Sequence, residues 1–363
     1  MDWDDFIRTQ IEPACKPSQA VPETGPTLYG SLEAEYQALA QAIGIIDRRY
    51  RALLEVQGRD RADWLHNLTT NTVKTLLPGE GNYAFACSVQ GRILFDLIVM
   101  VRKDRIWLTL DRLFLSKALA HFNRYIVTED VRVQDRTLEF AQIAIGGPKV
   151  HALLGEIGSA NSVAMPQYAM MDVDWQGSTV AVFRNDFCGV PGAEFILPID
   201  QAAGFWQWAV AADRHVRAVP VGDEAVQVHR IESGIPWPGH EITEHQLPAE
   251  TQQLDRAVSF QKGCYLGQEV VERMRSRHVV ANLLCAMRLS GNEAPAGGAK
   301  IMSEDGGHIG NLTSACRSLA SGAIAALGYL KSAAAKPSAN VKITQDAVRI
   351  WDGTIVELPR PLR

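Results

Sequence analysis

The nine residues from Ile93 to Val101 constrain the fold more than any other segment, because eight of them are apolar and the ninth is Asp96. A continuous apolar run of this length predicts a strand that is covered on both faces. A buried carboxylate without a partner costs several kcal/mol or takes up a proton. Asp96 therefore needs an internal ion pair or backbone hydrogen bonds, or it has a function towards a ligand amine or as a proton acceptor.

The residues around this run alternate between strand and helix patterns. Gly81 to Cys87 and Ile106 to Leu110 predict two further short strands. After Asp111, apolar residues recur at steps of four, three and four, which predicts a helix that is capped by Asp111 and lies on the sheet. These apolar residues are Leu115, Leu119, Phe122 and Ile126.

Glycine and proline clusters divide the chain. Gly146-Gly147-Pro148 fits poorly inside any helix or strand, and Ser290 to Gly298 has the composition of a linker. Short strand patterns separated by turns follow this linker and predict a small terminal β-barrel or sandwich. We expect an α+β domain at 1–145, a second α+β domain at 146–225, a return segment at 226–278 that packs on the first domain, and a β-barrel at 279–363.

Composition excludes several classes of protein. Lys and Arg total 36 against 41 Asp and Glu, and the net charge of -5 provides no field that would attract nucleic acid. The cysteines form no C-x-x-C pair and the histidines lack ligand spacing, so no metal site is expected. The acidic N-terminus differs from signal and transit peptides, and no apolar run approaches the ~18 residues of a membrane span. We expect a cytoplasmic protein with no membrane or direct nucleic-acid partner.

Glu194 is a second candidate, because it follows a tight loop that contains Gly189, Pro191 and Gly192. A rigidly held carboxylate offers two parallel acceptors, which suit a ligand edge with adjacent N–H donors, such as the 2-amino group and ring N–H of a pterin. A glycine-rich loop before a strand is also an ordinary turn. Both interpretations stay open.

Cys264 lies two residues after Lys262 and between Gly263 and Gly267. A neighbouring ammonium group favours the thiolate, so an exposed Cys264 would be a reactive or ligand-binding sulfur. The competing interpretation is a small, inert core residue, which is the more frequent role of a single cysteine.

Two further features have both a structural and a functional interpretation. Arg273, Arg275 and Arg277 would share one face of an extended chain, either as a solvated edge or as a docking strip for carboxylates or phosphates. Trp237, between two prolines, either fills a gap in the core or stacks on an aromatic ligand.

Taken in this order, the segments resemble the YgfZ family of folate-binding iron–sulfur maintenance proteins, which is related to the aminomethyltransferase (T-protein) of the glycine cleavage system. Residues 262–269 match the signature Lys-Gly-Cys-Tyr-x-Gly-Gln-Glu, and residues 230–238 resemble the family's Arg-Leu-Glu-x-Gly-Ile-Pro-Trp-Pro. The wider T-protein pattern covers all of the chain except its N-terminal segment.

The resemblance implies a three-domain α+β aminomethyltransferase-like fold around a central cavity, with the small C-terminal β-barrel as third domain. It implies that the cavity holds tetrahydrofolate or a one-carbon derivative. Glu194 would grip the pterin, Asp96 would face the reactive folate nitrogens, and Tyr83 and Arg230 would line the same pocket. Asp96 and Cys264 are the residues that the resemblance implies for the chemistry.

Two residues depart from the T-protein pattern. Phe95 replaces the first Asp of a pair, and Cys264 replaces the Asp of a Lys-Gly-Asp motif, so transfer of an aminomethyl group from a lipoyl carrier is in doubt. The implied function is a tetrahydrofolate-binding accessory protein for the assembly or repair of iron–sulfur enzymes, including tRNA-modifying ones. The alternative is a folate-dependent aminomethyltransferase or a related demethylase, and the sequence leaves open whether the chain is an enzyme.

Overall fold

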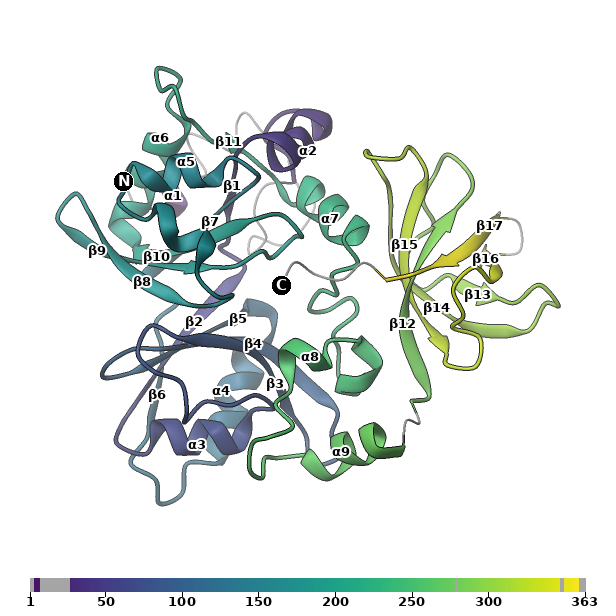
Figure 1. The fold of residues 1–363 in the computed structure, drawn as a ribbon, viewed down its shortest axis with the longest axis horizontal. Helices are drawn as coiled ribbons and strands as arrows, with labels where there is room; N and C mark the ends of the chain where they lie inside the picture. The colour runs from purple at the N-terminus through teal and green to yellow at the C-terminus, as the bar shows by residue number, and fades with distance from the viewer. Residues whose placement is uncertain (1–2, 7–26, 278–279, 347–348, 359–363) are drawn as a thin grey trace.

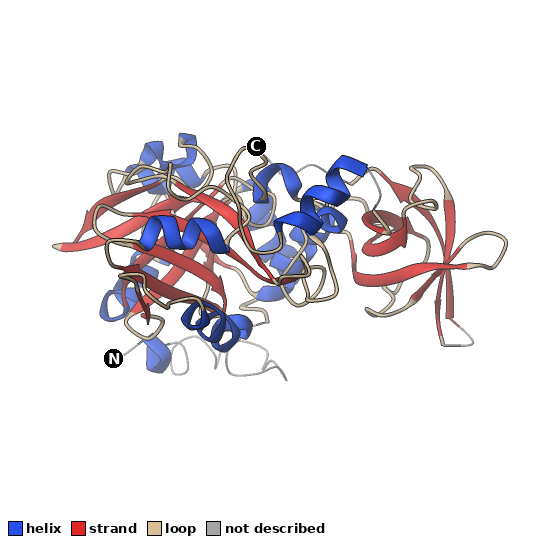
Figure 2. Ribbon diagram, turned by 90° about the horizontal axis from the view of Figure 1, so that it is seen from below, coloured by secondary structure: helices blue, strands red, loops and turns tan. Residues whose placement is uncertain are grey.

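The computed structural model describes residues 3–6, 27–277, 280–346 and 349–358. Two β-sheets lie one above the other with helices on their outer sides, and a closed β-barrel lies at one end of this pair (Figure 1). Seen from below, the barrel extends well beyond the two-sheet body (Figure 2). Within the described part of the chain, no helix is both long enough and apolar enough to span a membrane.

The first sheet and the helices attached to it comprise β2 Arg51–Gln57, α3 Arg61–Leu68, β3 Gly81–Cys87, β4 Ile93–Val101, β5 Ile106–Asp111, η3 Arg112–Phe114, α4 Leu115–Arg124 and β6 Arg132–Asp135. Its strand order is β3-β4-β5-β2-β6. Helices α3 and α4 cover its outer face through a core that includes Trp64, Leu68 and Phe122. The predicted helix is therefore confirmed, although Asp111 caps the short 3-10 turn before α4 by accepting the backbone N–H of Leu113 at 2.9 Å.

The second sheet and its helices comprise α1 Trp3–Phe6, α2 Leu32–Gln41, β1 Gly44–Asp47, β7 Phe140–Gly146, α5 Val150–Gly155, η4 Ala160–Ala164, β8 Met170–Trp175, β9 Ser178–Arg184, β10 Gly192–Pro198, η5 Ile199–Gln201, α6 Ala202–Val210 and β11 Val219–Pro220. The strand order is β11-β1-β7-β10-β9-β8. A core that includes Trp3, Leu153, Phe195 and Phe205 packs α1, α5 and α6 against one face of this sheet.

The sheets do not divide the chain at the glycine-proline cluster. Strand β1 and all of β7 except its last residue, Gly146, lie within the expected 1–145 domain, yet both strands belong to the second sheet. The chain therefore crosses between the sheets before Gly146-Gly147-Pro148, after β1 and again after β6. Local sequence patterns identify strands but do not indicate which sheet a strand joins, and this explains the difference.

The inner faces of the two sheets pack against each other. Their shared core contains Ile98 and Met100 of β4 together with Phe183 of β9 and Ile196 of β10. Strand β4 is thus covered on both faces, as its apolar run predicts. Side chains alternate along a strand, so Asp96 shares the inner face with Ile98, and Glu194 shares it with Ile196.

The return segment contains α7 Asp223–Glu232, η6 Pro248–Thr251, α8 Leu254–Ala257 and α9 Gln268–Arg277, and the barrel contains β12 Asn282–Leu289, β13 Lys300–Met302, β14 His308–Arg317, β15 Ile324–Lys331, β16 Asn340–Gln345 and β17 Arg349–Val356. The barrel closes in the order β12-β15-β14-β13-β16-β17, which confirms the predicted terminal barrel. Ile231 of α7 joins an apolar cluster with Leu284, Ala286 and Leu327 of the barrel.

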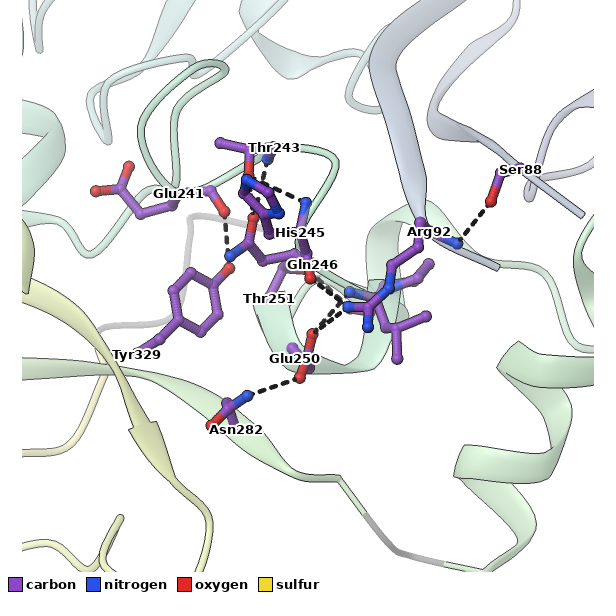
Figure 3. A network of polar contacts seen from close by, with 12 residues as sticks. Ser88, Arg92, Glu241, Thr243, His245, Gln246, Glu250, Thr251, Asn282 and Tyr329 are labelled. Carbon is purple, nitrogen blue, oxygen red and sulfur yellow. Dashed lines mark hydrogen bonds and ion pairs between the residues drawn. The ribbon is translucent and has the colours of Figure 1, made fainter. Parts of the chain in front are cut away.

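Polar contacts join the return segment to the first sheet and to the barrel (Figure 3). Arg92, in the turn before β4, donates to the carbonyl oxygen of His245 and lies 3.9 Å from the Glu250 carboxylate. Glu250 in turn accepts a hydrogen bond from Asn282 at the start of the barrel, at 3.2 Å. The segment after α7 therefore connects the first sheet to the barrel.

The three alternating arginines are not in an extended chain, which corrects the expectation of a one-sided strip. All three fall within α9, which ends at Arg277, and the helical geometry turns Arg273 and Arg275, two residues apart, to different sides. Arg273 pairs with Glu269, and Arg275 lies 3.1 Å from Glu272. These i,i+4 and i,i+3 pairs are typical of a solvated helix.

Candidate functional site

A small cavity lies where the inner faces of both sheets meet the loop that contains Trp237. Its volume is about 50 Å³. Both sheets and the return segment contribute to its polar and aromatic lining, which includes Arg48, Arg51, Tyr83, Asp96, Asn185, Phe187, Trp237 and Arg256. The cavity therefore lies between the two sheets, where segments that are distant in sequence come together.

Asp96 presents a carboxylate oxygen without a partner. Its Oδ2 accepts a hydrogen bond from the Tyr83 hydroxyl at 3.0 Å, and its Oδ1 has no hydrogen-bond partner among the described residues. Burial raises the pKa of Asp96, although Arg51 and the Tyr83 hydroxyl act in the opposite direction. Asp96 thus combines a free acceptor with an increased tendency to hold a proton.

Glu194 is completely buried on β10 and faces the same layer. Its Oε1 lies 3.0 Å from Nη2 of Arg48 and accepts a hydrogen bond from Asn185 at 2.6 Å. Its Oε2 has no partner among the described residues. Arg48 and Asn185 line the cavity. Glu194 therefore lies directly behind the lining and holds these two side chains in place.

Three arginines of the cavity were not identified from the sequence. Arg48 and Arg51 lie in a short charged stretch that resembles an exposed turn, and Arg256 follows an acidic residue in a polar segment. In the structure, Arg51 donates to Thr109 at 3.3 Å, and the Arg256 guanidinium lies 4.3 Å from the ring centre of Tyr83. Only tertiary packing brings these cations to the carboxylates.

Unpartnered polar atoms gather around this cavity. Besides Asp96 Oδ1 and Glu194 Oε2, the Nε atoms of Arg48 and Arg256 are buried without a hydrogen-bond partner among the residues that the structure describes. Buried polar groups are normally satisfied. The two free acceptors, on facing sheets, match a planar polar ligand that carries N–H donors.

Arg230 is not brought to the cavity lining. It is 1 % exposed and its Nη1 lies 2.8 Å from Glu241, while its Nη2 donates to Ser314 of β14 at 2.8 Å. Glu241 also accepts the backbone N–H of Trp237 at 2.9 Å. Arg230 therefore lies behind the lining: it pairs with the carboxylate that holds the Trp237 loop, and its guanidinium carbon lies 5.8 Å from the Trp237 ring centre.

Cys264 is exposed and lies apart from the cavity lining. The nearby Lys262 does not pair with it, because its Nζ donates to the carbonyl oxygens of His66, Thr69 and Asn71 at 2.5, 2.5 and 2.7 Å. The lysine thus caps the C-terminal end of α3 and anchors the motif on the first sheet's helical layer. No group of three or more His, Cys, Asp or Glu arranged for a metal occurs among the described residues.

Phe95 points away from the cavity. Its ring packs in the outer core against Phe122 and His121, with ring centres 5.6 and 5.8 Å apart. A carboxylate at position 95 of this backbone would face the same helices. The replacement at this position therefore removes no acidic group from the cavity.

Comparisons with known proteins agree with this architecture. Residues 20–262 match the family model described as the GCVT N-terminal domain, and residues 283–360 match the glycine cleavage T-protein C-terminal barrel domain. The fold is similar to that of a solved glycine cleavage system aminomethyltransferase T from Bartonella henselae. The TM-score is 0.85 at 19% identity, covering 96% of this chain and 95% of that chain.

Curated relatives are similar over nearly the whole chain. An aminomethyltransferase of Chloroherpeton thalassium is 27% identical over 335 residues, 92% of this chain and 91% of the relative. A putative chloroplastic transferase of Arabidopsis thaliana is 25% identical over 323 residues, 89% of this chain and 72% of the relative. The aminomethyltransferase of Bacillus subtilis is 25% identical over 296 residues, 81% of each chain.

Proposed function

The chain belongs to the family of the GCVT N-terminal domain, and from this premise we propose that it binds tetrahydrofolate or a one-carbon derivative in the cavity between the two sheets. The observation that carries the proposal is the pair of carboxylates on two facing sheets, Asp96 and Glu194, each with one buried oxygen that has no hydrogen-bond partner in the part of the chain that the structure describes. Tetrahydrofolate would supply the nitrogens that carry a one-carbon unit.

The residues that line the cavity, together with Glu194 behind Arg48 and Asn185, fit the parts of such a ligand. Glu194 offers a fixed acceptor for the adjacent N–H donors of a pterin. Tyr83, Phe187 and Trp237 supply aromatic surface for the flat ring. Asp96, whose pKa burial raises, is suited to hold or accept a proton at the nitrogens of the ligand.

Binding requires the cavity to widen. Its present volume of about 50 Å³ is well below the roughly 300–1,000 Å³ of typical ligand pockets. The Ile235–Pro238 part of its lining belongs to a loop and not to a helix or strand. We propose that this loop, which the hydrogen bond from Trp237 to Glu241 holds in the present structure, moves to admit the ligand.

We further propose that the chain is a cytoplasmic accessory protein that supports the assembly or repair of iron–sulfur enzymes, including tRNA-modifying ones. Support comes from the exposed Cys264, which lies outside the cavity and is therefore accessible to a protein partner. Activity of an iron–sulfur enzyme, compared between cells with and without the chain, tests this role. Equal activities would contradict it.

A one-carbon transferase is the second candidate. The names of the relatives favour it, and Phe95 does not argue against it, because that side chain lies outside the cavity. Methylene-tetrahydrofolate formation from an amine donor by the purified protein would establish this function. Folate binding without such turnover would favour the accessory role.

Calorimetric titration with tetrahydrofolate tests the shared premise. We expect saturable binding to the wild type and about 10- to 100-fold weaker binding to Asp96→Asn, because a hydrogen bond to a charged group contributes about 1.5–3 kcal/mol. Asp172→Asn, at an exposed carboxylate on β8, is the matched control and should bind like the wild type. Absence of binding to the wild type would contradict the proposal.

A further inference from the structure

Arg48 occupies the space in front of Glu194. Its side chain is 3 % exposed, its Nη2 lies 3.0 Å from Glu194 Oε1, and its Nη1 donates to the Tyr50 hydroxyl at 2.6 Å. Its guanidinium carbon lies 4.2 Å from the ring centre of Phe187, 4.9 Å from that of Tyr50 and 5.8 Å from that of Trp237. The buried carboxylate thus faces a planar cation enclosed by aromatic rings.

A guanidinium and the edge of a pterin present the same pattern to a carboxylate. Each is planar and carries N–H donors on two nitrogens bonded to one carbon. Each also stacks on aromatic rings. Three of the contacts that Arg48 makes, those with Glu194, Phe187 and Trp237, are therefore contacts that the proposed function assigns to the pterin.

We infer that Arg48 is an internal occupant of the pterin subsite, so that folate binds at Glu194 only after the Arg48 guanidinium has left this carboxylate. This inference rests on the proposed function. The cavity volume of about 50 Å³ agrees with it, because withdrawal of the guanidinium frees both the acceptor and the space beside it. Arg48 then sets the affinity of the site for its ligand.

The displaced cation retains a counter-charge. Asp111 interacts electrostatically with Arg48 from the first sheet, in addition to Glu194. On this inference the guanidinium turns from Glu194 towards Asp111 when the ligand binds, so that the protein has a closed state and a state competent to bind. The apparent affinity falls in proportion to the competent fraction.

Titration of Arg48 variants with tetrahydrofolate tests the inference. We expect Arg48→Met to bind at least tenfold more tightly than the wild type, because the carboxylate is no longer occupied. Glu194→Gln in the Arg48→Met background should abolish this gain. Arg48→Lys retains a positive charge beside Glu194 but lacks the planar edge of the guanidinium. It should also bind tetrahydrofolate more tightly than the wild type, and it replaces Arg48→Met in the comparison if that variant does not fold.

Weaker binding by both Arg48 variants would overturn the inference, since Arg48 would then be a ligand contact. Unchanged binding would overturn it as well, since the ligand would bind without displacing Arg48.

A second probe separates this inference from the folate proposal. Methylguanidinium should raise the melting temperature of Arg48→Met, and of Arg48→Lys, by more than that of the wild type, because it refills the vacated subsite. This result without tetrahydrofolate binding by any variant would support the internal occupant and overturn the folate proposal. Equal shifts of the melting temperature in the wild type and the variants would overturn the inference about Arg48 and leave the folate proposal standing.

Discussion

The backbone N–H of Trp237 donates to the Glu241 carboxylate at 2.9 Å, and the same carboxylate oxygen lies 2.8 Å from Arg230. The other oxygen of Glu241 accepts a hydrogen bond from Ser314 of the barrel at 2.6 Å. One buried carboxylate thus links the cavity loop, α7 and the barrel.

Arg230→Met should destabilise the protein by about 3–5 kcal/mol, because it leaves the fully buried Glu241 without its cation. Urea unfolding measures this change. Arg349→Met breaks an exposed ion pair with Asp346 and should cost at most about 1 kcal/mol. Similar losses for both variants would show that Arg230 has no special structural role.

Asp96→Asn should stabilise the folded protein at pH 7 by about 0.5–2 kcal/mol while it weakens folate binding. Burial raises the pKa of Asp96 above its unfolded value near 3.8, so the native state binds more protons and its stability falls as the pH rises above that value. The advantage of the variant should therefore be small at pH 3 and larger at pH 7. Denaturant unfolding at both pH values checks this; an advantage independent of pH would refute it.

His66 should make stability depend on pH between about 4 and 6.5. The backbone N–H of Val73 donates to its Nδ1 at 3.1 Å, and burial, with Lys262 and Lys74, lowers the pKa of His66 to about 4. Below its unfolded pKa of 6.5 the unfolded state binds more protons, so stability decreases as the pH falls towards 4.

The stability lost between pH 7 and pH 5 should be smaller in His66→Asn than in the wild type. Urea unfolding at the two pH values measures this loss. His245→Asn, at an exposed position, serves as the control and should lose as much as the wild type. Equal losses in all three proteins would exclude His66 as the source.

Cys264→Ala should leave both the stability and the affinity for tetrahydrofolate within error of the wild type, because the side chain is exposed and outside the cavity. It should nevertheless fail to restore the activity of an iron–sulfur enzyme in cells that lack the chain. Calorimetry and a complementation assay provide the two readouts. Full complementation by the variant would remove Cys264 from the proposed role.

The two carboxylates of the site could be predicted from the sequence, because Asp96 is the only charged residue in an apolar strand and Glu194 lies near the start of another apolar strand. Their cationic partners were not. Arg48 and Arg51 occur among other charged residues, where the sequence resembles a solvated turn, and their burial depends on the second sheet covering the first. Arg230 could be recognised only through a resemblance, which does not reveal its contact with Glu241.

The fold followed from local patterns where these were strong, as in β4, α4 and the terminal barrel. Prediction failed where two local patterns competed. The alternation of Arg273, Arg275 and Arg277 favoured an extended strip, whereas the Glu269–Arg273 and Glu272–Arg275 spacings are helical. Assignment of β1 and β7 to the second sheet depends on strand pairing over long sequence separations, which no local pattern encodes.

The structure of the protein solved with tetrahydrofolate at saturating concentration decides whether the ligand binds between the two sheets. We expect density there, with the pterin beside Glu194, the Arg48 guanidinium withdrawn, and the folate nitrogens next to Asp96. Density for the ligand elsewhere, with the Arg48–Glu194 pair intact, would contradict it.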